Sequence, residues 1–312
     1  MMQFKIKVKS MNRVAVIGVP SSAGAHGVGQ ERAPQSFRQA GFMELLSSLG
    51  LDVIDFGELP EVSYRPDPHR PNQQNLALVC DVIKQVTKQV NRAIFQDAKP
   101  IVIGGDCTIT LGVIAGLVNQ FPNLGLIYLD GGTDLNTPKD SHTGILDGMG
   151  LAHIIGKGAY EMTHIGHRYP LMDEEKILLF GYNPDSGWMD EAETKRLEVC
   201  SMIKYPLSKI RGKPEEAALK ALSQLEVNVD QILVHFDIDV IDFSDFPVAD
   251  VPHENGLSFS ETMKTLKVFI SNPKFAGLVI TEFNADRDKD GTLSQKFING
   301  IIGTLKLGHN HW

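Results

Sequence analysis

The chain has 312 residues, of which 42% are hydrophobic and 22% charged, as is typical of a globular protein with a sizeable core. A formal net charge of -8 argues against non-specific binding to nucleic acid or to anionic membranes. Three cysteines without paired spacing argue against a disulfide framework, and neither a signal peptide nor a membrane span is expected. We therefore expect a cytoplasmic protein with one domain, residues 1–312.

Apolar runs alternate with helical patterns along most of the chain. Eight apolar runs predict strands, at residues 13–19, 51–57, 101–105, 126–130, 177–182, 200–205, 231–237 and 276–282. Helical patterns occur from residue 33, at 75–96, from 109, at 145–155, 190–197 and 214–225, from 258, and at 292–305. Continuous apolar strands separated by helices are typical of a parallel sheet covered on both faces. The predicted fold is therefore α/β, a three-layer αβα sandwich with a mostly parallel central sheet of about eight strands.

Two segments stand outside this alternation. Residues 1–12 are predicted to be an N-terminal extension. Residues 58–74 are rich in proline and polar side chains, and they are too long for a simple connection between elements. We predict that this second segment is an excursion or a lid-like loop.

Acidic side chains gather where predicted strands end. Asp130 and Asp134 lie four apart after a buried run, and two ionised carboxylates that close repel unless a cation or a proton separates them. Asp237 and Asp239 follow a later strand, and an i, i+2 spacing places both on one side of an extended segment. Because parallel strands share a carboxyl edge, this pattern predicts a hydrolytic site with two divalent metal ions. The alternative is that each aspartate caps a turn or a helix.

Several motifs, in the same order along the chain, resemble those of the arginase/agmatinase ureohydrolase family. They are Gly104-Gly-Asp-Cys107-Thr, Asp130-Gly-Gly-Thr-Asp134-Leu-Asn-Thr-Pro138, Phe236-Asp-Ile-Asp239 and Thr281-Glu-Phe-Asn284. The resemblance implies an arginase-like fold and a binuclear Mn²⁺ site, in which a metal-bridging hydroxide attacks a guanidinium carbon and urea is released.

The resemblance also implies roles for individual acidic residues. Asp130 and Asp237 would bridge both metal ions, Asp134 would ligate the first and Asp239 the second. Glu282 would hold the guanidinium group through a charge-assisted hydrogen bond.

This chain departs from the family pattern at four positions. The two histidine ligands of the family fall on Cys107, which can ligate as a thiolate, and on Gly132, which has no side chain. The histidine that shuttles protons aligns with Asp147, a carboxylate that can relay protons if its pKa is raised. Asn136 and Thr143 stay polar where the family binds the carboxylate of the amino acid, whereas Ile145 replaces a polar residue.

Two hypotheses follow from this pattern. The first is a metal-dependent amidinohydrolase that acts on arginine, a peptidyl arginine or an arginine-like compound. The second is a catalytically inactive homologue that acts as a regulatory or interaction protein. The resemblance suggests a homo-oligomer, a trimer or hexamer, and the net charge predicts no nucleic-acid or membrane partner. Four histidines near the altered loop are considered as substitutes for the missing imidazole: His142, His153, His164 and His167.

Overall fold

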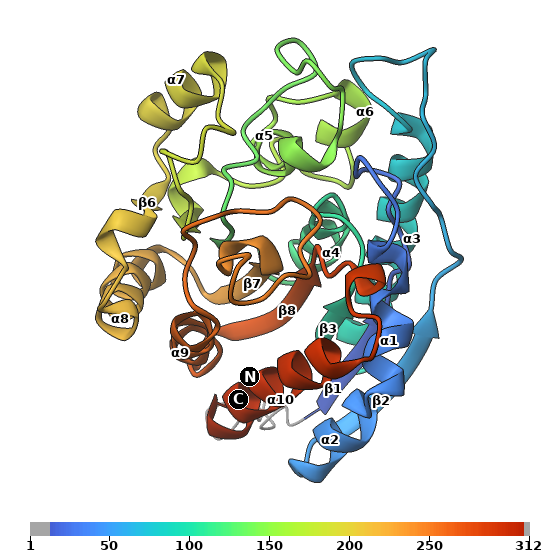
Figure 1. Cartoon of the computed structure of the whole chain (residues 1–312), viewed down its shortest axis with the longest axis vertical. Helices are drawn as coiled ribbons and strands as arrows, with labels where there is room; N and C mark the ends of the chain where they lie inside the picture. The colour runs from blue at the N-terminus through green and yellow to red at the C-terminus, as the bar shows by residue number, and fades with distance from the viewer. Residues whose placement is uncertain (1–12, 309–312) are drawn as a thin grey trace, which may run out of the picture.

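The computed structural model describes residues 13–308, so the predicted extension at residues 1–12 lies outside the described part of the chain. One sheet of eight strands forms the centre of this part, in the order β2-β1-β3-β8-β7-β4-β5-β6, and every pairing is parallel (Figure 1). The strands are β1 (Arg13–Gly18), β2 (Asp52–Glu58), β3 (Lys99–Ile103), β4 (Leu124–Leu129), β5 (Ile177–Phe180), β6 (Ile203–Tyr205), β7 (Gln231–Asp237) and β8 (Phe275–Thr281).

Helices cover both faces of the sheet, and each face has its own hydrophobic cluster. One cluster includes side chains of α1 (Ala33–Gln39), α2 (Phe42–Ser48), α8 (Pro214–Leu225), α9 (Phe259–Ile270) and α10 (Thr292–Gly308). The other includes side chains of α3 (Leu76–Phe95), α4 (Ile109–Leu117), α5 (Gly150–Ile154), α6 (Tyr160–Thr163) and α7 (Glu191–Val199). The prediction of a three-layer αβα sandwich is thus confirmed.

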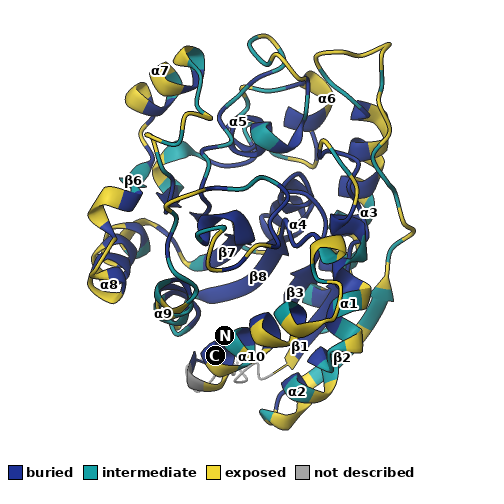
Figure 2. Ribbon diagram, in the orientation of Figure 1, coloured by how far each residue is buried: buried dark blue, intermediate teal, exposed yellow. Residues whose placement is uncertain are grey.

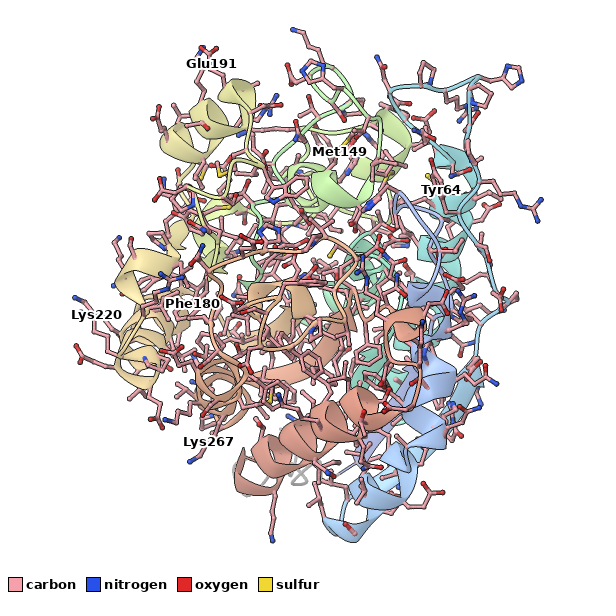
Figure 3. All side chains as sticks on the ribbon, in the orientation of Figure 1. Tyr64, Met149, Phe180, Glu191, Lys220 and Lys267 are labelled. Atoms are coloured by element: carbon pink, nitrogen blue, oxygen red, sulfur yellow. The ribbon has the colours of Figure 1, made fainter. Side chains whose placement is uncertain are left out.

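Burial follows this layering closely. The central strands β3, β4, β7 and β8 are almost wholly buried, and every residue of α4 is buried as well (Figure 2). Figure 3 shows the opposite pattern at the periphery, where the side chains of Glu191 and Lys220 project outwards. In the described part of the chain, no helix combines the length and the apolar character needed to cross a bilayer.

Two predicted helices differ from the structure, in both cases at a glycine. The helical pattern that begins at Ala33 is divided into α1 and α2, because Gly41 takes a left-handed φ of 81° between them. The helix predicted for residues 145–155 begins too early. Residues 147–149 form a 3-10 turn with non-helical torsions at Gly148, and the α-helix itself spans only Gly150–Ile154.

The segment that contains Asp237 and Asp239 is also not extended throughout. Strand β7 ends at Asp237, and Ile238–Val240 form a 3-10 turn. Asp237 caps this turn, because its Oδ1 accepts a hydrogen bond of 2.7 Å from the backbone N–H of Asp239. The predicted i, i+2 strand geometry of this pair is therefore wrong. The period of two applies instead to His235 and Asp237, which share one face of β7.

The segment between β2 and α3 runs beside the loop that follows β4. Val62 forms a parallel bridge with Ser21. Further along, Gln74 donates through its backbone N–H to the carbonyl oxygen of Gly144 at 2.9 Å, and through Nε2 to that of Thr143 at 2.7 Å. These contacts attach the end of the segment to the loop that carries several of the predicted site residues.

Candidate active site

A cavity of about 660 Å³ opens where four neighbouring strands end. Cys107 follows β3, Asp134 follows β4, Asp237 and Asp239 lie at the end of β7, and Glu282 follows β8; all five line the cavity. The sheet order β3-β8-β7-β4 places these strand ends side by side, although they are far apart in the sequence. Asp147, Asn136 and Thr143 line the same cavity. The structure therefore brings together the acidic residues that the sequence singles out.

Loops from several parts of the chain surround this cavity. Tyr64 from the segment after β2 lines it, and so do Trp188 and Met189 from the segment before α7. Figure 3 labels Tyr64 and Met149, which belong to two of the chain segments gathered in the upper part of that view. A cavity that combines such apolar side chains with convergent polar and acidic groups is typical of a small-molecule site.

Asp130 is buried and Asp134 is half-buried, and their hydrogen-bond partners differ. Asp130 Oδ1 accepts a hydrogen bond of 2.5 Å from the N–H of Gly132, whereas its Oδ2 has no hydrogen-bond partner among the described residues. Asp134 Oδ2 accepts one of 2.5 Å from the hydroxyl of Tyr128. Burial raises the pKa of Asp134 to about 8, and burial together with Asp239 raises the pKa of Asp130 well above its ordinary value. Both pKa shifts arise mainly because burial disfavours the charged form of each carboxyl group, and neighbouring acidic residues add to the shifts.

Cys107 lies between two carboxyl groups. Its Sγ donates to Oδ2 of Asp237 at 2.7 Å, and its backbone N–H donates to Oδ1 of Asp147 at 2.6 Å. Burial and the adjacent Asp237 raise the pKa of the thiol, so that Cys107 stays protonated unless a cation binds there. Burial, followed by the charge of Asp106, likewise raises the pKa of Asp147.

Asp239 is the acidic residue of this site with a cationic partner. Its Oδ2 lies 3.2 Å from Nε2 of His253, and its Oδ1 accepts a hydrogen bond of 2.9 Å from the N–H of Gly131. Burial alone would raise the pKa of Asp239 and lower that of His253, but the interaction between the two outweighs burial and reverses both shifts. The interaction therefore favours the ionised form of both side chains.

Glu282 has an unusual backbone conformation. Its φ is 64°, which an L-residue with a long side chain rarely adopts, and such strain is characteristic of functional positions. Its Oε2 accepts a hydrogen bond of 2.9 Å from Nε2 of Gln30, whereas its buried Oε1 has no partner in the described structure. Burial, followed by the charge of Asp147, raises the pKa of the Glu282 carboxyl group.

The two residues predicted to bind substrate are held by neighbouring loops. Asn136 donates through Nδ2 to Oε2 of Glu193 at 3.2 Å, and its buried Oδ1 has no described partner. The carbonyl oxygen of Thr143 accepts the hydrogen bond from Gln74, and its Oγ1 lies 3.4 Å from the hydroxyl of Ser141. Glu193 was not among the predicted site residues, although it also accepts hydrogen bonds from Thr133 and from the N–H of Leu135.

His235, a buried histidine that was not among the predicted site residues, lies next to the acidic cluster. His235 has no exposed surface, and its Nε2 lies 3.7 Å from Oδ2 of Asp130. Its ring stacks on Tyr128 at a centroid distance of 3.9 Å, and its Nδ1 lies 2.8 Å from Oγ1 of Thr110. Burial lowers the pKa of His235 to about 3, so that the imidazole is neutral at physiological pH. In the sequence, the spacing of two between His235 and Asp237 indicates that both side chains lie on one face of the strand, but it does not indicate that Asp130 is close to them.

The four histidines proposed from the sequence as substitute ligands lie elsewhere. His142 lines the outer part of the cavity, and His153 is buried within α5. His164 stacks between Tyr160 and Tyr169, whereas His167 is exposed. Within residues 13–308, none of the four belongs to a group of side chains close enough together to share a metal ion.

The side chains of the site are suited to a divalent metal ion. Two buried groups each place their potential ligand atoms within 4.8 Å of one another. One group consists of Cys107, Asp130, His235 and Asp237, and the other of Cys107, Asp147 and Glu282. Asp130 Oδ2, His235 Nε2 and Glu282 Oε1 are buried without a hydrogen-bond partner in the described structure, which is costly unless another group binds them. Carboxylate, imidazole and thiolate are common metal ligands.

Comparison with known proteins identifies the family of this chain. The family profile described as "Arginase family" matches residues 12–305, so the chain belongs to the arginase family. An arginase of Bacillus subtilis (strain 168) is 27% identical over 301 residues, which cover 94% of this chain and 99% of that protein. Among solved structures, the arginase of Bacillus caldovelox superposes with a TM-score of 0.87 at 25% identity, covering 95% of this chain and 98% of that one. An arginase of Entamoeba histolytica in complex with L-ornithine has a TM-score of 0.84 at 25% identity, with coverages of 95% and 98%.

Proposed function

We propose that this protein is a metal-dependent hydrolase that cleaves a guanidino C–N bond and releases urea. The observation that carries the proposal is the buried carboxylate cluster at the carboxyl edge of four strands, with unpartnered oxygens of Asp130 and Glu282. Two buried carboxyl groups with unsatisfied oxygens, one of which (Glu282) lines the cavity, favour a bound cation and a cationic substrate.

Each role can be assigned to a side chain of this protein. The carboxylates of Asp130 and Asp237 would hold the metal with Cys107, and a metal in such a site activates water and balances negative charge. Glu282, through the free Oε1, would orient the guanidinium group by a charge-assisted hydrogen bond. Asp147, whose pKa is raised by burial, can hold a proton and donate it to the leaving amine as water adds to the guanidinium carbon.

The charge of the cavity favours a cationic substrate. Seven acidic residues line it, and no lysine or arginine is present among the described lining residues. A cavity with an excess of one sign of charge concentrates ligands of the opposite sign. The arginase of Entamoeba histolytica was solved in complex with L-ornithine, which supports an amino-acid-sized substrate. Ile145, which lines the cavity close to Thr143, is apolar where the family has a polar residue, so an arginyl peptide is the alternative substrate.

The proposal is tested by urea release from the purified protein. Arginine, agmatine, guanidinobutyrate and a peptide with a terminal arginine are assayed before and after dialysis against Mn²⁺, Co²⁺ or Zn²⁺, and bound metal is determined in parallel. The expected result is metal-dependent urea release from at least one of them. Metal-loaded protein that releases no urea from any of the four would contradict the proposal.

A second function is favoured by one observation. Two carboxyl groups expected to bind a second metal ion have protein partners instead: Asp134 accepts a hydrogen bond from Tyr128, and Asp239 pairs with His253. Gly132, at the position of a further expected ligand, has no side chain. A catalytically inactive homologue with a regulatory or interaction role would show this arrangement. It predicts no urea release under any metal loading.

Several expectations from the sequence stay predictions. They are Mn²⁺ as the metal, a trimeric or hexameric assembly, a cytoplasmic location and a single domain.

A further inference from the structure

We propose that His235 supplies, through Nε2, the imidazole ligand of a single transition-metal site made with Cys107, Asp130 and Asp237. The four side chains are buried, and one potential ligand atom from each lies within 4.8 Å of the others. The inference rests on the proposed function and extends it, because it names the side chain that supplies an imidazole where the two histidine ligands of the family are replaced by Cys107 and Gly132.

The geometry of the sheet explains why these side chains converge. His235 and Asp237 lie two residues apart on β7, so they project from the same face of the sheet. On the neighbouring strand β4, Tyr128 pairs with His235, and Asp130 follows two residues later. Cys107, which follows β3 on the other side of β8, reaches Asp237 through its Sγ at 2.7 Å. Three strand ends thus place their ligand atoms around one point.

The orientation of the imidazole is set by a residue of α4. Thr110 Oγ1 lies 2.8 Å from Nδ1 of His235, and both side chains are buried. When Nδ1–H donates to this hydroxyl, the lone pair of Nε2 faces Asp130, whose Oδ2 is 3.7 Å away. Both Nε2 and Oδ2 lack a partner in the described structure. A hydrogen bond to the other ring nitrogen is the usual support of a metal-binding histidine, so Thr110 is a positioning residue.

The ligand set determines which metal the site prefers. Thiolate and imidazole are softer ligands than those typical of Mn²⁺, and Zn²⁺ and Co²⁺ accept one sulfur, one nitrogen and two carboxylate ligands readily. The groups expected to hold a second ion have other partners: Asp134 accepts from Tyr128, and Asp239 pairs with His253. The site therefore takes one ion of the Zn²⁺ or Co²⁺ type, and Cys107 loses its proton when that ion binds.

Co²⁺ is the probe, because its complexes report their ligands directly. The full chain is titrated with Co²⁺ while absorption and proton NMR spectra are recorded. The expected results are one Co²⁺ per chain, a near-ultraviolet thiolate-to-cobalt absorption band, and one exchangeable, paramagnetically shifted resonance from the Nδ1–H of a single coordinated imidazole. The wild-type resonance tests the proposal without any substitution.

Substitutions of His235 and Thr110 test whether the shifted resonance comes from the imidazole of His235. His235→Gln should abolish the shifted resonance and weaken Co²⁺ binding by at least 10-fold, and Thr110→Val should weaken it by about 10- to 100-fold, as is usual when the support of a ligating histidine is removed. His142→Gln is the matched control, because His142 lines the cavity and belongs to neither ligand group. It should leave both the resonance and the affinity unchanged.

The outcomes separate this inference from the proposed function. Co²⁺ binding without a shifted imidazole resonance, or unchanged affinity in His235→Gln, overturns the inference even if urea is released. A shifted resonance that depends on His235, together with no urea release, supports the inference and contradicts the hydrolase. Failure to bind Co²⁺, Zn²⁺ or Mn²⁺ overturns both.

Discussion

Gly132 is the position at which the acidic cluster lacks a side chain. A Cβ placed there would lie 3.2 Å from Oδ1 of Asp130 and 3.8 Å from Oδ1 of Asp134, and the φ of Gly132 is outside the left-handed range. A side chain at this position would therefore point between the two carboxylates without backbone strain. Because position 132 is a glycine, the loop lacks the side chain that would complete a second set of metal ligands.

The substitution Gly132→His is expected to add a second metal ion to the site. The new imidazole would join Asp134 in binding it, at the expense of the hydrogen bond between Asp134 and Tyr128. Metal content after dialysis should rise by one ion per chain, and Gly132→Ala is the control that adds the Cβ alone. Unchanged stoichiometry in Gly132→His would show that position 132 does not correspond to the histidine ligand of the family.

Glu282 allows a test of substrate binding that does not alter the size of the side chain. In Glu282→Gln the charge is lost, while an oxygen that can accept the hydrogen bond of Gln30 is retained. We expect kcat/KM for the guanidino substrate to fall by about 10- to 100-fold, because a hydrogen bond to a charged group contributes about 1.5–3 kcal/mol. Bound metal should stay the same, since Asp130, His235 and Asp237 are untouched. An unchanged kcat/KM would exclude Glu282 from substrate binding.

At the residue scale, sequence reasoning reached the carboxylates more easily than the histidine. Asp130, Asp237 and Glu282 stand out because charged residues rarely follow buried strands without a reason. His235 does not stand out, since a lone histidine inside an apolar run is usually a core residue. Its proximity to Asp130 depends on the pairing of β7 with β4, and no local pattern in the sequence specifies which strands are neighbours.

Among the secondary-structure elements, α1 and α2 show where helical periodicity fails. The apolar spacing from Ala33 to Leu46 continues across Gly41, so periodicity alone predicts one helix. The structure turns at Gly41 with a φ of 81°, and both short helices then pack their aromatic residues into the same hydrophobic cluster. Phe37 and Phe42, one on each helix, lie with ring centroids 6.1 Å apart. Periodicity does not predict the break at Gly41, because the packing of the two short helices determines where the chain turns.

Two glycine substitutions test this account of the break. Gly41→Ala should destabilise the protein by about 1–2 kcal/mol, because an L-residue is strained in the left-handed region. Space is not the cause, since the nearest atom to an added Cβ is Oε2 of Glu44 at 3.9 Å. Gly303→Ala in α10 is the matched control: it has no left-handed φ, and nothing lies within 4 Å of its added Cβ. It should stabilise the protein by about 0.5–1 kcal/mol. Chemical denaturation measures both, and equal effects would contradict the account.

For the whole molecule, parallel topology explains how far the site could be predicted. Buried strands separated by helices imply a parallel sheet, and a parallel sheet brings the carboxyl ends of its strands to one edge. That argument places Cys107, Asp130, Asp237 and Glu282 at the same edge. It does not specify the order β3-β8-β7-β4, which decides which of these residues meet. The order depends on long-range packing between helices and strands, so it has no local signal in the sequence.

The pH dependence of stability offers a test on the whole molecule, through a histidine remote from the metal ligands. His153 in α5 is fully buried, and burial lowers its pKa from 6.5 to about 4. Between these values the unfolded chain binds a proton that the folded protein does not, so stability falls as the pH is lowered from 6.5 to 4. The full effect is about 3 kcal/mol, at about 1.4 kcal/mol per pKa unit.

His153→Leu should remove this part of the pH dependence. Its stability relative to wild type should therefore increase as the pH is lowered through that window, measured by denaturant unfolding at a series of pH values. Comparison with wild type at each pH cancels the opposite contribution of the buried carboxyl groups, whose raised pKa values favour the folded state in acid. Substitution of the exposed His167 by glutamine is the control, because its imidazole stays hydrated in both states. A constant difference between His153→Leu and wild type across the window would show that His153 accepts its proton equally well in the folded protein.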